Sequence, residues 1–203
     1  MLGRQLPGLA GPSLRGWDLG FTILFLAGAG VFFLLLLSSL YALGRTGVPV
    51  RHSPPEAIAA ACRLAAIRDG DQILDVGAGN GGFLLHVARN HAVTAVGWEL
   101  SLPMLIAARS RMLLAGMARR VRVGWGDSRA QDWSGADVVY CYLMPRVLEG
   151  VREKLLREAK PGARVLSFAF PVPGWTPAEI AIAGSRKDPV YLYRMDEIRR
   201  SRS

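Results

Sequence analysis

The chain has 203 residues, and roughly 150 of them follow an apolar segment near the N-terminus, about the size of one compact domain. Hydrophobic residues make up 51% of the chain and charged residues 20%, which excludes a disordered polyelectrolyte. The formal net charge of +9 predicts attraction to polyanions, either nucleic acid or the anionic face of a bilayer. The two cysteines, Cys62 and Cys141, lie far apart, which argues against a disulfide framework and a structural zinc site and favours a reducing compartment.

The first predicted element is a transmembrane helix at residues 21–43. This run carries no charge, and as a helix it is long enough to cross about 30 Å of hydrocarbon. Trp17 and Tyr41 lie near its two ends, where aromatic rings favour the membrane interface. A cleaved signal peptide is the alternative, with Ala42-Leu43-Gly44 as the cleavage site, but the apolar run is long for that role.

Basic residues leave the orientation of this helix open. Arg4 and Arg15 on one side roughly balance Arg45 and Arg51 on the other under the positive-inside rule. We expect five parts in the chain: a tail at 1–20, the transmembrane helix at 21–43, a linker rich in Gly and Pro at 44–55, a catalytic domain at 56–198, and a basic tail at 199–203.

Apolar runs alternating with amphipathic stretches predict an α/β domain after a first helix at 56–67. Strands are expected at 72–76, 92–98, 121–125, 136–142 and 163–170, with helices at 82–90, 102–118 and 146–159. This alternation favours a parallel sheet covered on both faces. Two further short strands, at 179–183 and 189–194, are joined by Gly-Ser-Arg-Lys-Asp, which predicts a hairpin and a seven-stranded sheet with an antiparallel last strand.

The strongest chemical motif is the strand and glycine loop at residues 73–82, Ile-Leu-Asp-Val-Gly-Ala-Gly-Asn-Gly-Gly. Glycine permits tight turns and lets a ligand approach the backbone. The spacing of Gly77, Gly79 and Gly82 also fits a dinucleotide-binding loop. Asp75, two residues before the first glycine, favours a cationic amino-acid ligand over a pyrophosphate, and therefore S-adenosylmethionine over a nicotinamide dinucleotide.

Two further carboxylates follow the next two predicted strands. Glu99 is placed to accept hydrogen bonds from both hydroxyls of a ribose, and Asp127 from the exocyclic amine of adenine. Each alone is consistent with a strand-end or capping residue, but all three fall at the carboxyl ends of parallel strands, where ligands bind in open α/β sheets.

These motifs resemble those of the seven-stranded class I methyltransferases. Segments at 48–54, 143–148, 161–165 and 170–177 narrow the resemblance to the mitochondrial and archaeal protein-lysine methyltransferases, which include the enzymes acting on the adenine nucleotide translocase and the ATP synthase c subunit. The most specific segment is Phe-Pro-Val-Pro-Gly-Trp-Thr-Pro at 170–177. The resemblance implies a Rossmann-like sheet of strand order 3-2-1-4-5-7-6, and no metal.

The resemblance and the strand-end positions together give a candidate site. The expected cofactor is S-adenosyl-L-methionine, and the residues predicted to bind it are Asp75, Gly77, Ala78, Gly79, Asn80, Gly81, Glu99, Leu100, Asp127, Ser128 and Ser53. His52 lies beside Ser53, and we weigh a role for it there. An aromatic entrance that disfavours a protonated lysine is predicted from Tyr140, Tyr142, Pro145, Phe170 and Trp175.

We therefore expect a single-pass membrane methyltransferase that acts on a lysine of a membrane or membrane-adjacent protein. Its domain would face the cytoplasm or the mitochondrial matrix, where the cofactor is available. No specific nucleic acid is expected as a partner, because aromatic residues do not interleave with the arginines. The alternatives are a lipid or small-molecule acceptor such as a quinone precursor, a non-catalytic cofactor-binding membrane scaffold, and a dinucleotide oxidoreductase.

Overall fold

The computed structural model describes residues 15–46, 52–184 and 187–201. The predicted N-terminal tail up to residue 14, the Val48-Pro49-Val50 segment, two residues of the 184–188 turn and the last two residues of the basic tail therefore lie outside the described residues. The chain divides into two units, Met1–Leu37 and Ser38–Ser203.

The N-terminal helix α1 (Arg15–Thr46) has 32 residues and contains the whole of the predicted segment 21–43. Within it, Leu19–Arg45 is long and apolar enough to cross a membrane, a property shared with signal sequences. Large apolar side chains along this helix, such as Phe21 and Leu34, are mostly exposed. The side chain of Trp17 lies outside the described part of the helix, so its predicted interfacial position stays a prediction.

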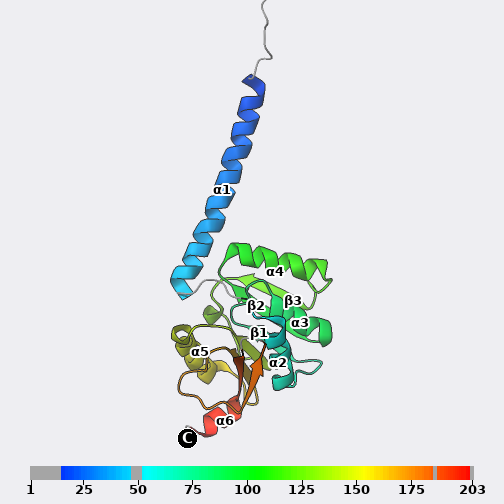
Figure 1. The fold of residues 1–203 in the computed structure, drawn as a ribbon, viewed down its shortest axis with the longest axis vertical. Coiled ribbons are helices and arrows are strands. Elements are labelled where there is room, and N and C mark those ends of the chain that lie inside the picture. The colour runs from blue at the N-terminus through cyan, green and yellow to red at the C-terminus, as the bar shows by residue number, and fades with distance from the viewer. Residues whose placement is uncertain (1–14, 47–51, 185–186, 202–203) are drawn as a thin grey trace, which may run out of the picture. The chain divides into compact units, whose positions relative to one another are not determined.

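The second unit contains a seven-stranded sheet of order β3-β2-β1-β4-β5-β7-β6 (Figure 1), which confirms the predicted fold class. Strands β1 to β5 are parallel, and β7 is antiparallel to both β5 and β6. The strands are β1 (Gln72–Asp75), β2 (Thr94–Glu99), β3 (Val121–Trp125), β4 (Val138–Cys141), β5 (Arg164–Phe168), β6 (Glu179–Ala183) and β7 (Asp188–Arg194).

Helices cover both faces of this sheet (Figure 1). One face packs against α2 (Pro55–Ala65), α3 (Gly82–Asn90) and α4 (Leu102–Leu114). The other face packs against α5 (Pro145–Glu158) and α6 (Met195–Arg200). A short 3-10 turn, η1, runs over Ser128–Ala130.

The pattern of burial explains why these sequences form these elements. All four residues of β4 are buried at the centre of the sheet, as expected for a parallel strand covered on both sides. The edge strands β3 and β6 instead expose both polar and apolar side chains, among them Arg122 and Trp125 of β3 and Glu179 and Ile180 of β6. α4 ends four residues before its predicted end, because Gly116 has a φ of +69° and interrupts the helix.

Arg164 connects α2 to the start of β5. Its guanidinium contacts Asp71 at 2.7 Å and donates to the carbonyls of Ala65 and Ala66, at 2.8 and 2.9 Å. Both side chains of the ion pair are mostly buried. Carbonyls at a helix C-terminus lack partners within the helix, so Arg164 satisfies groups that would otherwise be desolvated without hydrogen bonds.

Two glycines give a matched test of the packing. An added Cβ at Gly97 in β2 would lie 2.6 Å from Leu84 Cδ1 and 2.7 Å from Ala78 Cβ. Gly97→Ala should therefore lower the stability of the full chain by about 1–3 kcal/mol through overpacking. Gly150→Ala on α5 meets nothing closer than 3.7 Å and should raise stability by about 0.5–1 kcal/mol. Thermal unfolding in detergent measures both, and equal effects of the two substitutions would contradict the packing described for β2.

Candidate active site

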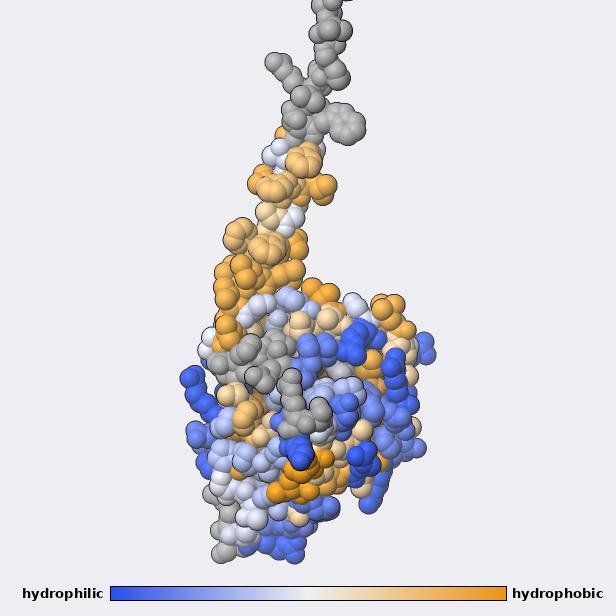
Figure 2. Space-filling model, in the orientation of Figure 1, coloured by the Kyte–Doolittle hydropathy of each residue, from blue (hydrophilic) through white to orange (hydrophobic). Residues whose placement is uncertain are grey.

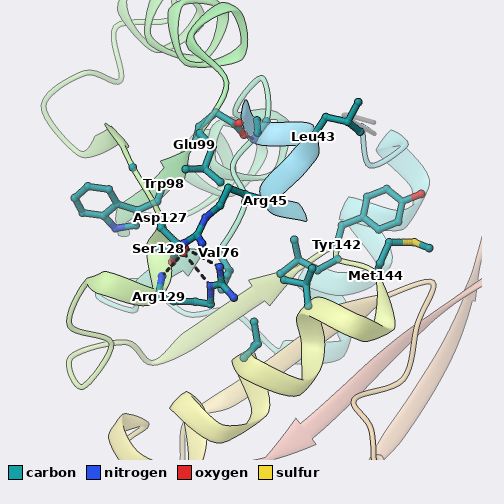
Figure 3. Close-up of a pocket in the computed structure, with 18 of the residues that line it drawn as sticks. Leu43, Arg45, Val76, Trp98, Glu99, Asp127, Ser128, Arg129, Tyr142 and Met144 are labelled. Carbon is teal, nitrogen blue, oxygen red and sulfur yellow. Dashed lines mark hydrogen bonds and ion pairs between the residues drawn. The ribbon is translucent and has the colours of Figure 1, made fainter. Parts of the chain in front are cut away.

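Two cavities open at the carboxyl ends of the central strands. The larger has a volume of about 320 Å³, and its lining includes residues of the β1–α3 turn, β2, the β3–η1 loop and the β4–α5 loop (Figure 3). The smaller contains Asp75, Ser53 and Tyr140 in its lining. Gly77, Gly79 and Tyr142 line both cavities, so the two adjoin at the glycine turn.

The glycine turn between β1 and α3 requires backbone conformations that other residues rarely adopt. Gly79 has a φ of +53° and Gly81 a φ of +74°. A Cβ at Gly81 would also lie 2.6 Å from Met112 Cε of α4. Gly81 lines neither cavity, so the structure places it in the packing of the turn against α4, and its predicted contact with the cofactor stays a prediction.

Glu99, at the end of β2, holds this turn in place. One oxygen of its buried carboxylate, Oε2, accepts the backbone N–H of Gly79 at 2.8 Å. The other oxygen, Oε1, accepts the backbone N–H of Ser101 at 2.8 Å. Because Ser101 is the N-cap residue of α4, a single carboxylate fixes both the glycine turn and the start of α4.

Asp75 is 2% exposed at the end of β1. The backbone N–H of Gly77 donates to its Oδ1 at 3.3 Å. Burial raises the pKa of Asp75 to about 7; the Gly77 N–H lowers this pKa and nearby Glu99 raises it further. A cationic ligand next to this carboxylate would stabilise its ionised form, because an opposite charge offsets the loss of hydration.

Asp127, which follows β3, is held by two arginines. Its Oδ1 accepts the backbone N–H and the Nε of Arg129, at 2.9 and 3.0 Å. Its Oδ2 accepts Nη2 of Arg129 at 2.7 Å and Nη2 of Arg45 at 3.1 Å (Figure 3). These contacts, above all the hydrogen bond from Arg129, hold the pKa of Asp127 well below its usual range. Each oxygen already accepts two hydrogen bonds, so a ligand amine would have to displace one of them.

The end of α1 lines the larger cavity, a feature that the sequence reasoning missed. Ser39, Leu40, Ala42, Leu43 and Arg45 belong to the same unit as the sheet and form part of the cavity wall. Our reasoning had assigned residues 21–43 to the bilayer. The polar pair Ser38-Ser39 was the available signal that the apolar run changes its surroundings there.

The predicted aromatic residues divide into two groups. Tyr140 is buried, stacks on Phe83 with a centroid distance of 4.0 Å, and shares a hydrogen bond of 2.6 Å with Ser53 Oγ. Burial raises the pKa of Tyr140 above its ordinary value, so this phenol is neutral. Tyr142 and Phe170 line the larger cavity, and His52 lines the smaller one.

Pro145 and Trp175 line neither of the two cavities. Pro145 is the exposed first residue of α5. Trp175 is buried and packs edge-on against Tyr193 at a centroid distance of 5.6 Å. Its indole nitrogen has no hydrogen-bond partner among the described residues. Their assignment to an acceptor entrance stays a prediction.

The remaining predicted cofactor residues line the cavities. Leu100 and Ser128 line the larger one, and Ala78 and Asn80 the smaller one. Ser128 is 3% exposed, and its Oγ has no hydrogen-bond partner among the described residues. Buried hydroxyls are usually hydrogen-bonded, so this one is an exception, and the predicted contact of Ser128 with the cofactor stays a prediction.

Comparisons with known proteins identify similar chains. The family model described as the ANTKMT methyltransferase domain matches residues 75–179, just over half of the chain. A protein-lysine N-methyltransferase from Saccharolobus islandicus is 31% identical over 153 residues, which cover 74% of this chain and 95% of the relative. The adenine nucleotide translocase lysine N-methyltransferase of Mus musculus is 30% identical, covering 82% of this chain and 74% of the relative.

A solved structure is similar as well. The RNA methyltransferase from Salinibacter ruber, crystallised with S-adenosyl-L-homocysteine, has a TM-score of 0.69 and 30% sequence identity. The match covers 72% of this chain and 95% of that one. The fold of this neighbour and the S-adenosyl-L-homocysteine crystallised with it agree with the fold class and the cofactor predicted from the sequence.

The buried carboxylate of Asp75 gives the first prediction for the site. Its raised pKa means that the free protein loses stability as the pH rises from about 4 to about 7. Asp75→Asn removes this ionisation, so it should raise the melting temperature of the cofactor-free chain above pH 7 and have little effect near pH 4. The gain in the free energy of unfolding corresponds to at most a few kcal/mol.

The same variant, Asp75→Asn, should bind S-adenosyl-L-homocysteine at least about tenfold more weakly in calorimetry.

The matched control for Asp75→Asn is Asp196→Asn, at an exposed position on α6. It should change neither the affinity nor the pH dependence. Unchanged affinity in Asp75→Asn would contradict a contact between this carboxylate and the amino-acid part of the ligand.

Glu99→Gln should behave differently from Asp75→Asn. Both oxygens of Glu99 accept backbone N–H groups, so an amide NH2 would face one of these donors. We expect Glu99→Gln to lower the stability of the cofactor-free chain by about 1–3 kcal/mol and to weaken cofactor binding as well. Melting curves and calorimetry on the two variants together test this, and a stabilising Glu99→Gln would show that the turn does not depend on this carboxylate.

Proposed function

Because the chain belongs to the ANTKMT methyltransferase family, we propose that it is a membrane-anchored protein-lysine N-methyltransferase with a substrate in or beside the membrane. The enzyme is an S-adenosylmethionine-dependent methyltransferase. Beyond this activity, we propose that the chain is anchored in a membrane, that the acceptor lysine lies in or beside that membrane, and that individual residues have the roles described below.

The observation that carries the proposed cofactor-binding roles is the buried Asp75 beside the glycine turn. It lies in the lining of the smaller cavity, where that cavity adjoins the larger one. An amino-acid ammonium placed beside Asp75 would offset the cost of burying its carboxylate. A diphosphate in the same place would add a like charge to an already desolvated group, which favours the cationic ligand.

The larger cavity fits the nucleoside part of the cofactor. Glu99 is placed for the ribose hydroxyls, since each of its oxygens accepts only one hydrogen bond in the described structure and has capacity for another. Leu100 and Val147 supply apolar wall for a planar base. The Oγ of Ser128 is free to bond a base atom, while Asp127 can accept an exocyclic amine once Arg45 or Arg129 gives up one contact.

The part of the smaller cavity next to Tyr142, where it adjoins the larger cavity, suits the acceptor amine, and the part beside Asp75 is left for the amino-acid end of the cofactor. The cofactor supplies a methyl group on a positively charged sulfur, and the acceptor nitrogen must be neutral and in line with it. Tyr140, Tyr142 and Phe83 surround this space with aromatic rings. Such surroundings disfavour the charged ammonium form of lysine and so lower its pKa, while ring faces still attract the incoming cation. Ser53, bonded to Tyr140, fixes the phenol that lines this space.

The membrane part of the proposal rests on α1 and on a relative. α1 is long and apolar enough to cross a bilayer. The mouse relative is named for its action on the adenine nucleotide translocase, itself a membrane protein. An anchor raises the effective concentration of acceptors in the same membrane. The catalytic unit would then lie on the cytoplasmic or matrix side, where the cofactor is present, with the N-terminus across the membrane.

A labelling experiment tests the acceptor. Purified full-length protein is incubated with methyl-labelled S-adenosylmethionine and native membranes, and a protein band should become labelled. The label should resist alkaline hydrolysis and appear as methyl-lysine after complete hydrolysis, because an N-methyl amine is stable to base and a methyl ester is not. Asp75→Asn should reduce the labelling at least about tenfold at subsaturating cofactor.

Three results would overturn the proposal. Label found only in lipid would indicate a lipid or quinone-like acceptor. Label found only in RNA would indicate the acceptor class for which the Salinibacter ruber relative is named. Binding of S-adenosyl-L-homocysteine without transfer to any membrane fraction would indicate a scaffold. Protease protection checks the orientation of the protein in the membrane. The catalytic unit should resist a protease that is added on the side opposite the cytoplasm or matrix.

A further inference from the structure

α4 and the end of β3 carry a group of exposed apolar side chains that the catalytic site does not use. Ile106, Leu113 and Leu114 of α4 are 54%, 71% and 87% exposed, and Trp125 at the end of β3 is 61% exposed. We refer to these four residues as the α4 face. Figure 2 shows apolar surface over α4 next to strongly hydrophilic residues. An exposed apolar group of this kind on a folded domain marks an interaction site.

The exposed residues of α4 include a stripe that runs along the helix axis. Leu102, Ile106, Arg109 and Leu113 recur at intervals of three and four residues, so they follow one stripe along the helix. The neighbouring side of the helix, with Leu105, Ala108 and Met112, is buried against the sheet. Trp125 belongs to the same surface because its indole N–H donates to the carbonyl of Leu100, just before α4, at 3.2 Å.

The charge of this region has a single sign. From residue 100 to residue 126 the sequence has no aspartate or glutamate. All five arginines of this stretch are exposed: Arg109, Arg111, Arg119, Arg120 and Arg122. Apolar side chains flanked by arginines, with a tryptophan at one end, are the composition of a helix that lies in the interface of an anionic bilayer.

Hydrogen bonds connect this surface to the end of α1. The backbone N–H of Leu102 donates to Ser38 Oγ at 3.2 Å, and the hydroxyls of Ser39 and Ser101 lie 3.4 Å apart. Ser38 directly follows Leu37, the last residue of the apolar N-terminal unit. The first turn of α4 therefore lies where the chain would leave a membrane.

We propose that the α4 face docks on the surface of the membrane that holds α1. Ile106, Leu113 and Leu114 enter the boundary between headgroups and acyl chains, and Trp125 lies at the level of the headgroups. The arginines bind anionic lipid headgroups. This inference rests on the proposed membrane anchoring and adds a second contact with the bilayer.

Docking would select acceptor lysines by their distance from the membrane surface. Leu100 and Gly126, which bound the docking segment in the sequence, both line the larger cavity. If the segment between them lies on the bilayer, the cavity is held close to the lipid headgroups. A lysine near the membrane surface then reaches the methyl group, and a lysine far out in the aqueous phase does not.

Fluorescent labelling of introduced cysteines tests the docking. The native Cys62 and Cys141 are buried and do not compete for the label. Full-length Leu113→Cys, labelled with an environment-sensitive dye, is reconstituted into vesicles of phosphatidylcholine and phosphatidylglycerol. We expect blue-shifted emission and strong quenching by lipids with a nitroxide near the headgroup. Glu153→Cys, at an exposed position of α5 on the other face of the sheet, should show neither effect.

A third label separates docking from anchoring. Gly30→Cys lies in α1, where an added Cβ meets nothing within 4 Å, and its label should be quenched by nitroxides deep in the acyl chains. Quenching at position 30 without quenching at position 113 would overturn the docking and leave the anchor intact. Absence of quenching at both positions would overturn both proposals.

Substitutions at the α4 face test its occupant. The double variant Leu113→Glu, Leu114→Glu should methylate a membrane-embedded acceptor several-fold more slowly and bind S-adenosyl-L-homocysteine as the wild type does. Vesicles of phosphatidylcholine alone should reduce the quenching at position 113 several-fold. The double variant could lose activity while the label at position 113 is never quenched in vesicles that contain no other protein. That result would mean that the surface binds a protein partner and that the membrane docking is wrong.

Discussion

The carboxylate of Glu99 fixes the geometry on which both cavities depend. It accepts the backbone N–H groups of Gly79 and Ser101, and so it ties the glycine turn and the start of α4 to the end of β2. A buried carboxylate is stable when backbone donors replace its lost water. The larger cavity lies beside this junction, with Asp127 on the next strand end. The carboxylate at the end of β2 therefore determines the positions of both the glycine turn that precedes α3 and the first turn of α4.

Asp75, unlike Glu99, is buried without enough hydrogen-bond donors to stabilise its ionised carboxylate. Burial raises its pKa to about 7, and among the described residues only the long hydrogen bond from the backbone N–H of Gly77 offsets that burial. The ligand-free chain thus contains a polar group that is poorly satisfied, and Ser128 Oγ is a second one. Binding sites commonly keep such groups because a preorganised, poorly solvated partner binds an oppositely charged or hydrogen-bonding ligand more strongly than a solvated one does. The two groups lie in the linings of adjoining cavities, as expected if one extended ligand satisfies both.

The sequence predicted the sheet and most of the residues that line the smaller cavity, because both depend on local patterns. Apolar runs set the strands, glycines set the turn, and the parallel topology brings Asp75, Glu99 and Asp127 to one edge. It does not encode how the loop before Trp175 is held against the core, because the contact that holds it, from the backbone N–H of Val172 to the hydroxyl of Tyr193, joins residues far apart in the sequence. It also missed Arg45, whose ion pair with Asp127 joins residues 82 positions apart, a separation that no local pattern encodes.

The contact of Arg45 with Asp127 bears on how much of the apolar helix α1 needs to lie in lipid. Residues 19–37 alone extend about 28 Å as a helix, close to the roughly 30 Å thickness of a hydrocarbon core. The following residues need not be in lipid: Ala42 is buried, and Ser39, Leu40 and Leu43 line the larger cavity. The last turns of α1 therefore belong with the sheet and not with the apolar N-terminal unit. Because their side chains form part of the wall of the larger cavity, substitutions in these turns change that wall directly.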